Sequence, residues 1–255
     1  MSDDRAIAHT FKPDTTLACR VRASPNHGDR RGRTVDALVL HYTGMASAGA
    51  ALARLCDPKA EVSSHYLVDE AGSVIQLVPE ARRAWHAGRS FWQGERDLNS
   101  VSIGIEIDNA GHDGGLPDFP EVQIRAVIAL CLDIIGRHHL PQERVLAHSD
   151  IAPGRKVDPG PRFPWARMAE AGVGIWPDDD GTHGELILAA GAVGPPVAEL
   201  RNKLARLGFD LPPSDALDAS CCEAIDAFLL RYRPDRPAGQ ADSRTLRTLG
   251  HLLRK

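Results

Sequence analysis

A strand and a helix that follow one another in the middle of this chain constrain its fold most. In residues 101–107, branched apolar residues alternate with Ser102, Gly104 and Glu106, the pattern of a β-strand with one buried face. The two small residues on the other face leave room beside Glu106. After a glycine-rich loop at 109–120, residues 121–139 repeat apolar side chains at helical spacing. A strand followed by an amphipathic helix indicates an α/β fold.

Shorter apolar runs extend this pattern on both sides. Further strands are predicted at 35–40, 63–68, 73–78 and 145–148, and a further helix at 46–56. The two middle strands are separated by four turn-forming residues and are expected to form a hairpin. Residues 1–34 carry no such pattern and are expected to be irregular. The sequence therefore predicts a mixed central β-sheet flanked by helices.

The composition changes near Gly172. Residues 176–181 are typical of an exposed linker, and the rest of the chain repeats apolar residues at helical spacing. Three short helices are predicted there, around 197–207, 225–229 and 246–253, and Asp242 or Ser243 is expected to cap the last one. We therefore predict a catalytic domain at 1–172, a linker at 173–190 and a small three-helix domain at 191–255.

The charge balance limits the classes of partner. The chain has 43% hydrophobic and 25% charged residues and a formal net charge of −4. An acidic protein is a poor match for nucleic acid or an anionic membrane, because both attract basic surfaces. No run reaches the roughly 18 apolar residues that span a bilayer, and residues 1–25 lack the apolar core of a signal peptide. We therefore expect a cytoplasmic protein without membrane insertion, with a periplasmic location as the alternative.

The five cysteines are an odd number without CxxC spacing. This favours reduced thiols over a disulfide framework. A cysteine nucleophile is the weaker alternative, since Cys56 and Cys131 fall within helical apolar patterns.

Two histidines and an aspartate form the strongest chemical signal. His41 and His148 each end a short apolar strand, where an α/β sheet presents functional groups. Asp158 follows in a loop whose conformation Pro153, Gly154, Pro159 and Gly160 restrict. Each residue alone has an ordinary alternative, a surface or core histidine or a simple turn. Together they match an open zinc site with two imidazoles, one carboxylate and a water.

Five strings in this order resemble the zinc-dependent N-acetylmuramoyl-L-alanine amidases of the type 2 family. The matching strings are residues 38–43, 62–68, 84–88, 102–106 and 147–160. Each string alone is weak, whereas the ordered set, between about 37 and 168, is specific. The family shares its fold with the peptidoglycan recognition proteins. The resemblance therefore implies hydrolysis of the amide between the lactyl group of N-acetylmuramic acid and L-alanine.

The resemblance also implies the roles of five residues. Zn²⁺ is expected on His41, His148 and Asp158, with Glu106 as the catalytic glutamate and Lys156 as the catalytic lysine. Zinc acts as a Lewis acid on the amide carbonyl and lowers the pKa of its bound water from about 15.7 towards 7. Glu106 can take the proton of that water and return it to the departing amine. Lys156 supplies a positive charge to the developing oxyanion.

Five further residues are predicted to serve catalysis or substrate binding, three of them with an alternative. Tyr66 matches a tyrosine that serves catalysis in some relatives, with packing as the alternative. Trp85 and His86 are predicted to form part of the substrate wall, where an aromatic face can stack on a sugar or a peptide. His65 is assigned to substrate binding, with a supporting position behind a ligand as the alternative. Arg89 is predicted to bind a peptide carboxylate bidentately, with a solvated surface position as the alternative.

The C-terminal region resembles a type 1 peptidoglycan-binding domain. The resemblance rests on residues 200–209, 224–228 and 245–249, and it departs from the pattern at 214–218 and at Leu229. With no export signal, we predict an enzyme that recycles 1,6-anhydro-muropeptides in the cytoplasm. The alternatives are a periplasmic or lytic amidase acting on intact peptidoglycan and a non-catalytic peptidoglycan-binding sensor. The expected partner is in each case a muropeptide or peptidoglycan.

Overall fold

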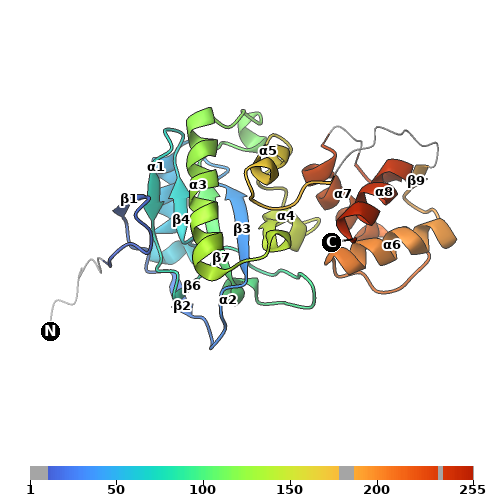
Figure 1. The fold of residues 1–255 in the computed structure, drawn as a ribbon, viewed down its shortest axis with the longest axis horizontal. Coiled ribbons are helices and arrows are strands. Elements are labelled where there is room, and N and C mark those ends of the chain that lie inside the picture. The colour runs from blue at the N-terminus through green and yellow to red at the C-terminus, as the bar shows by residue number, and fades with distance from the viewer. Residues whose placement is uncertain (1–10, 178–186, 235–237, 255) are drawn as a thin grey trace. The chain divides into compact units, whose positions relative to one another are not determined.

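The computed structural model describes residues 11–177, 187–234 and 238–254 (Figure 1). The chain divides into two compact units, Met1–His86 with Asn99–Leu140 and Ala87–Leu98 with Pro141–Lys255. Residues on both sides of position 172 therefore contribute to the second unit. Of the linker predicted at 173–190, residues 178–186 lie outside the described part of the chain.

A mixed sheet forms the centre of the first unit. Its strands are β1 (Ala18–Val21), β3 (Ala37–Tyr42), β4 (Tyr66–Val68), β5 (Val74–Gln76) and β7 (Ser102–Ile107), paired in the order β1-β5-β4-β7-β3. β7 runs parallel to β3 and β4, whereas β4 and β5 are antiparallel and confirm the predicted hairpin. The segment 1–34, expected to be irregular, contains β1 and also β2 (His27–Asp29), which pairs with β6 (Arg82–Ala84).

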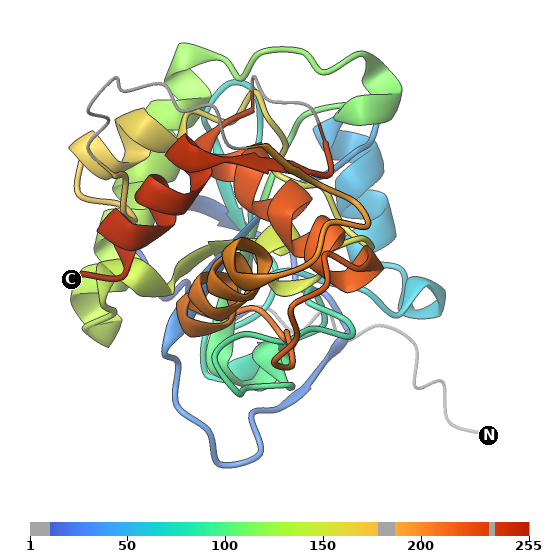
Figure 2. The same cartoon turned by 90° about the vertical axis from the view of Figure 1, so that its right-hand side faces the viewer.

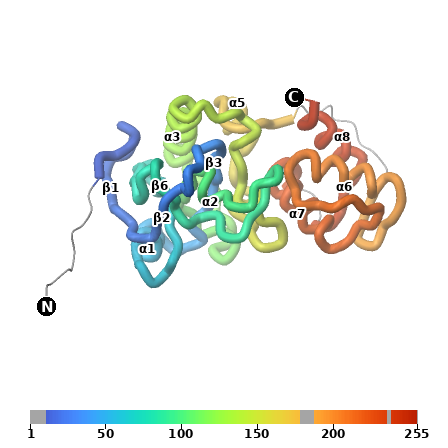
Figure 3. The backbone as a smooth tube through the Cα atoms, turned by 90° about the horizontal axis from the view of Figure 1, so that it is seen from below, coloured from blue at the N-terminus to red at the C-terminus, as the bar shows by residue number. Residues whose placement is uncertain are grey.

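Two helices cover opposite faces of this sheet, as Figure 3 shows from below. On one face lies α1 (Ala48–Leu55), whose N-cap Ser47 accepts from the Ala50 amide and whose Leu52 and Leu55 join Leu67 and Ile75 in one core cluster. On the other lies α3 (Glu121–His138), confirming the predicted amphipathic helix. Gln123 of α3 donates to the carbonyls of Val68 and Asp108, so the helix is tied to the ends of β4 and β7. Before β7 lies one turn of helix, α2 (Leu98–Val101). This arrangement confirms the predicted α/β fold.

The second unit carries the remaining elements. They are β8 (Val145–Ala147), α4 (His148–Ile151), α5 (Trp165–Glu170), β9 (Ile187–Ala189), α6 (Pro195–Leu207), α7 (Ala219–Tyr232), β10 (Gln240–Asp242) and α8 (Ser243–Leu252). Figure 2 shows α6, α7 and α8 in orange and red. Their residue ranges overlap the three segments in which helices are predicted. Asp242 caps α8 by accepting from the Thr245 amide, and Asp218 caps α7 in the same way. β9 and β10 pair antiparallel and were not predicted.

The helices of the described residues are all too short or too polar to cross a membrane. All five cysteines are free thiols, and Cys131 and Cys221 are buried.

Candidate metal centre

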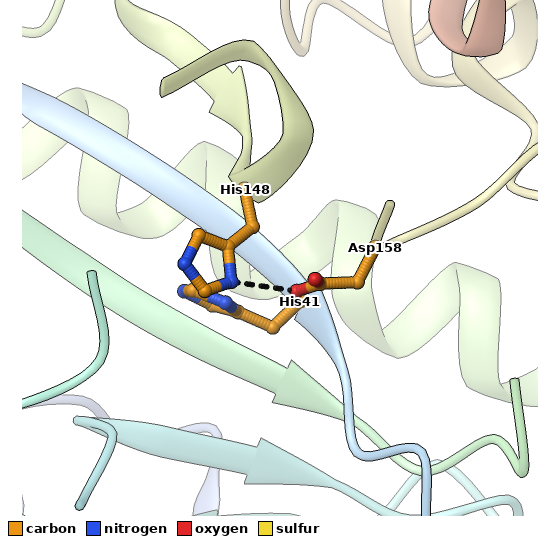
Figure 4. Close-up of side chains that lie close together, drawn as sticks. All are labelled: His41, His148 and Asp158. Atoms are coloured by element: carbon orange, nitrogen blue, oxygen red, sulfur yellow. Dashed lines mark hydrogen bonds and ion pairs between the residues drawn. The ribbon is translucent and has the colours of Figure 1, made fainter. Parts of the chain in front are cut away.

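Three predicted ligands lie together in the structure (Figure 4). His41 near the end of β3, His148 at the start of α4 and Asp158 each offer one ligand atom, and these atoms lie within 4.8 Å of one another. All three side chains are buried. His148 Nδ1 lies 2.9 Å from Asp158 Oδ2. Two imidazole nitrogens and one carboxylate oxygen converge as a divalent metal requires.

Backbone hydrogen bonds shape the loop that carries His148 and Asp158. The Ser149 amide donates to the Asp158 carbonyl at 3.0 Å, which brings the two ends of the loop together. His148 Nε2 lies 3.3 Å from the Ala87 carbonyl. A carbonyl oxygen can only accept, so an imidazole that donates from Nε2 to Ala87 can turn the lone pair of Nδ1 towards a cation beside Asp158. A lone pair beside a carboxylate oxygen is an arrangement that a cation satisfies, so the donor set fits a metal.

His41 is held by a second histidine. Its Nε2 lies 3.1 Å from His86 Nδ1, and His86 Nε2 lies 3.2 Å from Ser102 Oγ. The His86 amide also donates to Asn99 Oδ1. The His86 ring occupies the space above Gly104, where an added Cβ would come within 2.4 Å of His86 Cγ. The room that the sequence predicts on this face of the strand is therefore filled by His86.

Glu106 and Lys156 are each near a predicted ligand. Glu106 is next to His41 in the sheet, and Lys156 is near Asp158 in the sequence. Glu106 is the register partner of His41 in the parallel pair β3·β7, so the two side chains are on the same face of the sheet. Glu106 and Lys156 are both partly exposed. Lys156 stands two residues before Asp158, and its amide donates to the Ala152 carbonyl. The arrangement offers a carboxylate on β7, the strand beside the one that carries His41, and an ammonium in the loop that carries Asp158.

Comparison with known proteins agrees with this chemistry. A family model described as N-acetylmuramoyl-L-alanine amidase matches residues 31–161, about half of the chain.

The chain belongs to this amidase family.

Two relatives resemble the chain far beyond the matched segment. It is 42% identical over 235 residues to the N-acetylmuramoyl-L-alanine amidase AmiD of Escherichia coli (strain K12), covering 87% of this chain and 83% of that protein. The solved complex of E. coli AmiD with the substrate anhydro-N-acetylmuramic acid-L-Ala-D-gamma-Glu-L-Lys superposes with a TM-score of 0.75 at 38% identity, covering 91% of this chain and 90% of that one. AMPDH3 from Pseudomonas aeruginosa, in complex with anhydromuramic pentapeptide, gives a TM-score of 0.73 at 32% identity over 95% and 97% of the two chains. The likeness to these two amidases therefore extends beyond residues 31–161 and includes the C-terminal helices.

Tyr66 is not brought to the ligands of this amidase. It is the register partner of Ile105, one residue before the Glu106 position, and so points to the opposite face of the sheet from Glu106 and His41. Its hydroxyl is buried and donates to Glu80 Oε1 at 2.6 Å. The predicted catalytic role is corrected by this placement, and the packing alternative describes Tyr66.

Glu80 is the centre of a buried polar cluster on that face. It also forms an ion pair with both terminal nitrogens of Arg137, and its Oε2 lies 2.6 Å from His138 Nε2. Burial opposes ionisation, but the hydrogen bonds from Arg137, His138 and Tyr66 outweigh it and lower the pKa of Glu80 to about 2. Burial and the neighbouring Glu80 raise the pKa of the Tyr66 hydroxyl well above its usual range. The cluster joins the end of α3 to the sheet.

His65 supports the sheet and does not face a substrate. It is fully buried, its Nδ1 accepts from the Gly104 amide at 3.0 Å, and its Nε2 lies 3.0 Å from the Arg82 carbonyl. Burial, followed by the positive charge of Arg30, lowers the pKa of His65 to about 3. A ring with no exposed surface does not face a substrate, so the structure contradicts the substrate-binding assignment. The contacts of His65 are with Gly104, Arg82 and Arg30, and a position behind a metal ligand stays a prediction.

Trp85 and Arg89 are accessible, as a substrate contact requires. Trp85 is partly exposed, and its backbone is fixed by a pair of hydrogen bonds with Ser63. Arg89 is exposed, and its carbonyl accepts from Arg155 at 2.7 Å. Their contacts with substrate stay predictions. His86, assigned with them to the substrate wall, is only 9% exposed and contacts His41 instead.

Several supporting residues were not singled out from the sequence. They are Ser102 and Asn99 around His86, Ala87 beside His148, and Glu80 beside Tyr66. Of these residues, only Ser102 could be connected to the site from the sequence, because it is a small residue on the same face of the predicted strand as Glu106. The others act through carbonyls, or through contacts with residues distant in sequence, which a pattern of side chains does not record.

Proposed function

We propose that the protein hydrolyses the amide between the lactyl group of N-acetylmuramic acid and L-alanine in peptidoglycan fragments that carry a 1,6-anhydro sugar. The carrying observation is the convergence of His41, His148 and Asp158 within 4.8 Å in a member of this amidase family. The anhydro form is supported by the substrate in the AmiD complex and the ligand in the AMPDH3 complex.

The metal is proposed to be Zn²⁺ held by His41, His148 and Asp158. Two nitrogens and one oxygen from buried residues suit zinc, and three protein ligands leave a position open. When bound, zinc supplies Lewis acidity to the scissile carbonyl and to the attacking water. The chain orients its ligands through the contact of His148 with Ala87 and that of His41 with His86.

Glu106 and Lys156 are proposed to handle proton and charge. Glu106, on the His41 face, takes the proton of the attacking water and passes it to the amine that leaves with L-alanine. Lys156, in the ligand loop, places its ammonium charge near the oxygen that becomes negative. Trp85 offers an exposed aromatic face for the sugar or peptide, and Arg89 an exposed guanidinium for a stem-peptide carboxylate.

The C-terminal helices are proposed to form a peptidoglycan-binding-like domain at 191–255, after a linker at 173–190 and a catalytic domain at 1–172. The helices α6, α7 and α8 at the predicted places support this assignment. The proposed physiological role is recycling of anhydro-muropeptides, which the anhydro ligands of the two relatives support. A cytoplasmic location is proposed from the sequence alone, with a periplasmic location as the alternative.

The test is a product assay with two substrates. Purified protein is incubated with anhydro-N-acetylmuramyl tripeptide and, separately, with whole sacculi, and released peptides are identified by mass spectrometry. We expect free tripeptide from the fragment, none after chelation, and recovery on adding Zn²⁺. Asp158→Ala should abolish release. Turnover of sacculi alone would contradict the fragment assignment, and binding of either substrate without release would identify a sensor instead.

A further inference from the structure

A buried ion pair joins a C-terminal helix to the helix that carries a metal ligand. Arg231 of α7 donates from Nη1 to Asp150 Oδ2 of α4 at 2.7 Å, although the two residues are 81 positions apart. Both side chains are only 3% exposed. Burying two charges is costly unless their geometry is well satisfied, and losing one partner leaves an uncompensated charge. The pair therefore fixes its two helices strongly.

The Asp150 carboxylate also defines the turn that presents His148. The same oxygen, Oδ2, accepts from the Ala147 amide at 2.8 Å, immediately before His148. α4 has only four residues, which is too short to be stable through its own hydrogen bonds. The orientation of His148 thus depends on Asp150, and the orientation of Asp150 depends on Arg231.

Arg231 also contacts the element on the other side of the ligand loop. Its guanidinium carbon lies 4.0 Å from the ring centroid of Trp165, the first residue of α5. Stacking on tryptophan holds the planar guanidinium in one orientation. Since α4 begins at His148 and α5 begins after Asp158, one side chain contacts both ends of the segment that carries these two predicted ligands.

A second residue of α7 packs directly on that loop. Glu223 lies over Gly154, where an added Cβ would come within 2.4 Å of the Glu223 carboxyl carbon. Gly154 has φ +69°, a conformation that favours glycine. α7 therefore follows the ligand segment from Gly154 to Asp150.

We propose that Arg231 is a positioning residue for the metal centre, so that the C-terminal helices hold His148 and Asp158 in place in addition to any role in substrate binding. This inference rests on the proposed metal site. A binding domain that is only attached to the catalytic domain would not affect the metal centre. Here, removing the Arg231 side chain from α7 should weaken zinc binding.

Arg233 provides a matched control on the same helix region. It also forms a buried ion pair, with Asp242 at 2.9 and 3.1 Å, and this pair lies wholly within the C-terminal region. Arg231→Met and Arg233→Met each remove one buried guanidinium and keep an apolar stem. Both are expected to lower thermal stability, but only Arg231→Met breaks a contact to α4.

The experiment measures zinc affinity of the full chain by competition with a chromophoric chelator. Supporting contacts of metal ligands typically contribute 10–100-fold in affinity. We expect Arg231→Met to weaken zinc binding about tenfold or more, Arg233→Met to stay within about twofold of wild type, and Arg231→Lys to lie between them. Zinc affinity of Arg231→Met within about twofold of wild type would overturn the proposal, as would an equal loss of affinity in both methionine variants.

Hydrogen exchange of the metal-free protein separates this inference from the proposed function. Exchange in the peptide 145–158 should be faster in Arg231→Met than in wild type, and unchanged in Arg233→Met. If wild type binds no zinc, the proposed function fails while exchange still decides the role of Arg231. If Arg231→Met does not fold, Arg231→Lys and Asp150→Asn provide the same comparison, and unchanged exchange in both refutes it.

Discussion

His41 Nε2 lies 3.1 Å from His86 Nδ1, and the two rings are nearly perpendicular at 83°. A contact at one ring nitrogen fixes the orientation of the imidazole and leaves the other nitrogen available to a metal. Ser102 Oγ contacts the far side of His86 and Asn99 holds its backbone, so a chain of contacts extends from the sheet to the ligand. A residue predicted to contact substrate is thus placed to orient a ligand.

Replacing His86 should weaken zinc binding more than it weakens substrate binding. His86→Ala removes the contact to His41, and we expect zinc affinity to fall about 10–100-fold. Equilibrium competition with a chelator measures this. The control is Trp85→Ala, its neighbour, which should raise KM and leave zinc affinity unchanged. A His86 variant with wild-type zinc affinity and a raised KM would restore the substrate-wall assignment.

Adding one methyl group at position 104 should disturb the same chain of contacts. An alanine Cβ there would come within 2.4 Å of His86 Cγ, and ring and backbone cannot both stay in place. We expect Gly104→Ala to lower the free energy of unfolding by about 1–3 kcal/mol and to weaken zinc binding.

The glycine control lies on α3. An added Cβ at Gly136 meets nothing within 4 Å, so Gly136→Ala should stabilise the protein by about 0.5–1 kcal/mol. Urea unfolding of both variants measures the difference. Equal destabilisation by the two substitutions would show that space at Gly104 is not the cause.

Glu106→Gln tests the proton role without removing the side chain. Glutamine keeps the size of glutamate but cannot accept a proton at neutral pH, so we expect kcat to fall about 10²–10⁴-fold. Zinc content by metal analysis should stay at the wild-type level, because Glu106 is outside the proposed ligand set. A variant with lost zinc and lost activity together would indicate a structural role for Glu106.

Glu80 should make the fold sensitive to acid. The pKa of Glu80 in the folded protein is about 2, below its ordinary 4.5, so the ionised form stabilises the fold above pH 4.5 and this contribution is lost as pH falls towards 2. We expect a loss on the order of 3 kcal/mol across this window, measured as the free energy of unfolding of metal-free protein in urea.

Two variants check the origin of that dependence. Glu80→Gln should be less stable at neutral pH and should lose most of the dependence between pH 4.5 and 2. Asp133→Asn removes the more exposed partner of Arg137 and should change the free energy of unfolding by less than about 1 kcal/mol. A Glu80 variant with the full acid dependence of wild type would assign that dependence to other carboxylates.

The parts of the fold that follow from local patterns were predictable. The alternation in β7 and the helical spacing in α3 arise because one face of each packs on the core, and a chain records this directly. β1 and β2 were missed because their short, partly exposed sequences carry polar residues and exist through pairing with distant strands. His41 and His148 were found because each comes directly after a short run of apolar residues.

The direction of a side chain depends on tertiary pairing, and here prediction from sequence reached its limit. Whether Tyr66 faces the proposed metal ligands or α3 is decided by its register with β7, and a shift of one residue would reverse it. The sequence indicates space above Gly104, but only the tertiary structure shows that the His86 ring fills it. The ion pair of Arg231 with Asp150 spans 81 residues and leaves no periodic signal.

The short loop closed by the Ser149 amide and the Asp158 carbonyl makes two of the three proposed ligands a local chelate. Because closing a short loop costs little chain entropy, His148 and Asp158 can meet with few other contacts in place. His41 is 107 positions before His148 and reaches them only when β3 is in its sheet. A metal that needs all three ligands would therefore bind the completed sheet in preference to the unfolded chain, and its concentration would set the melting temperature.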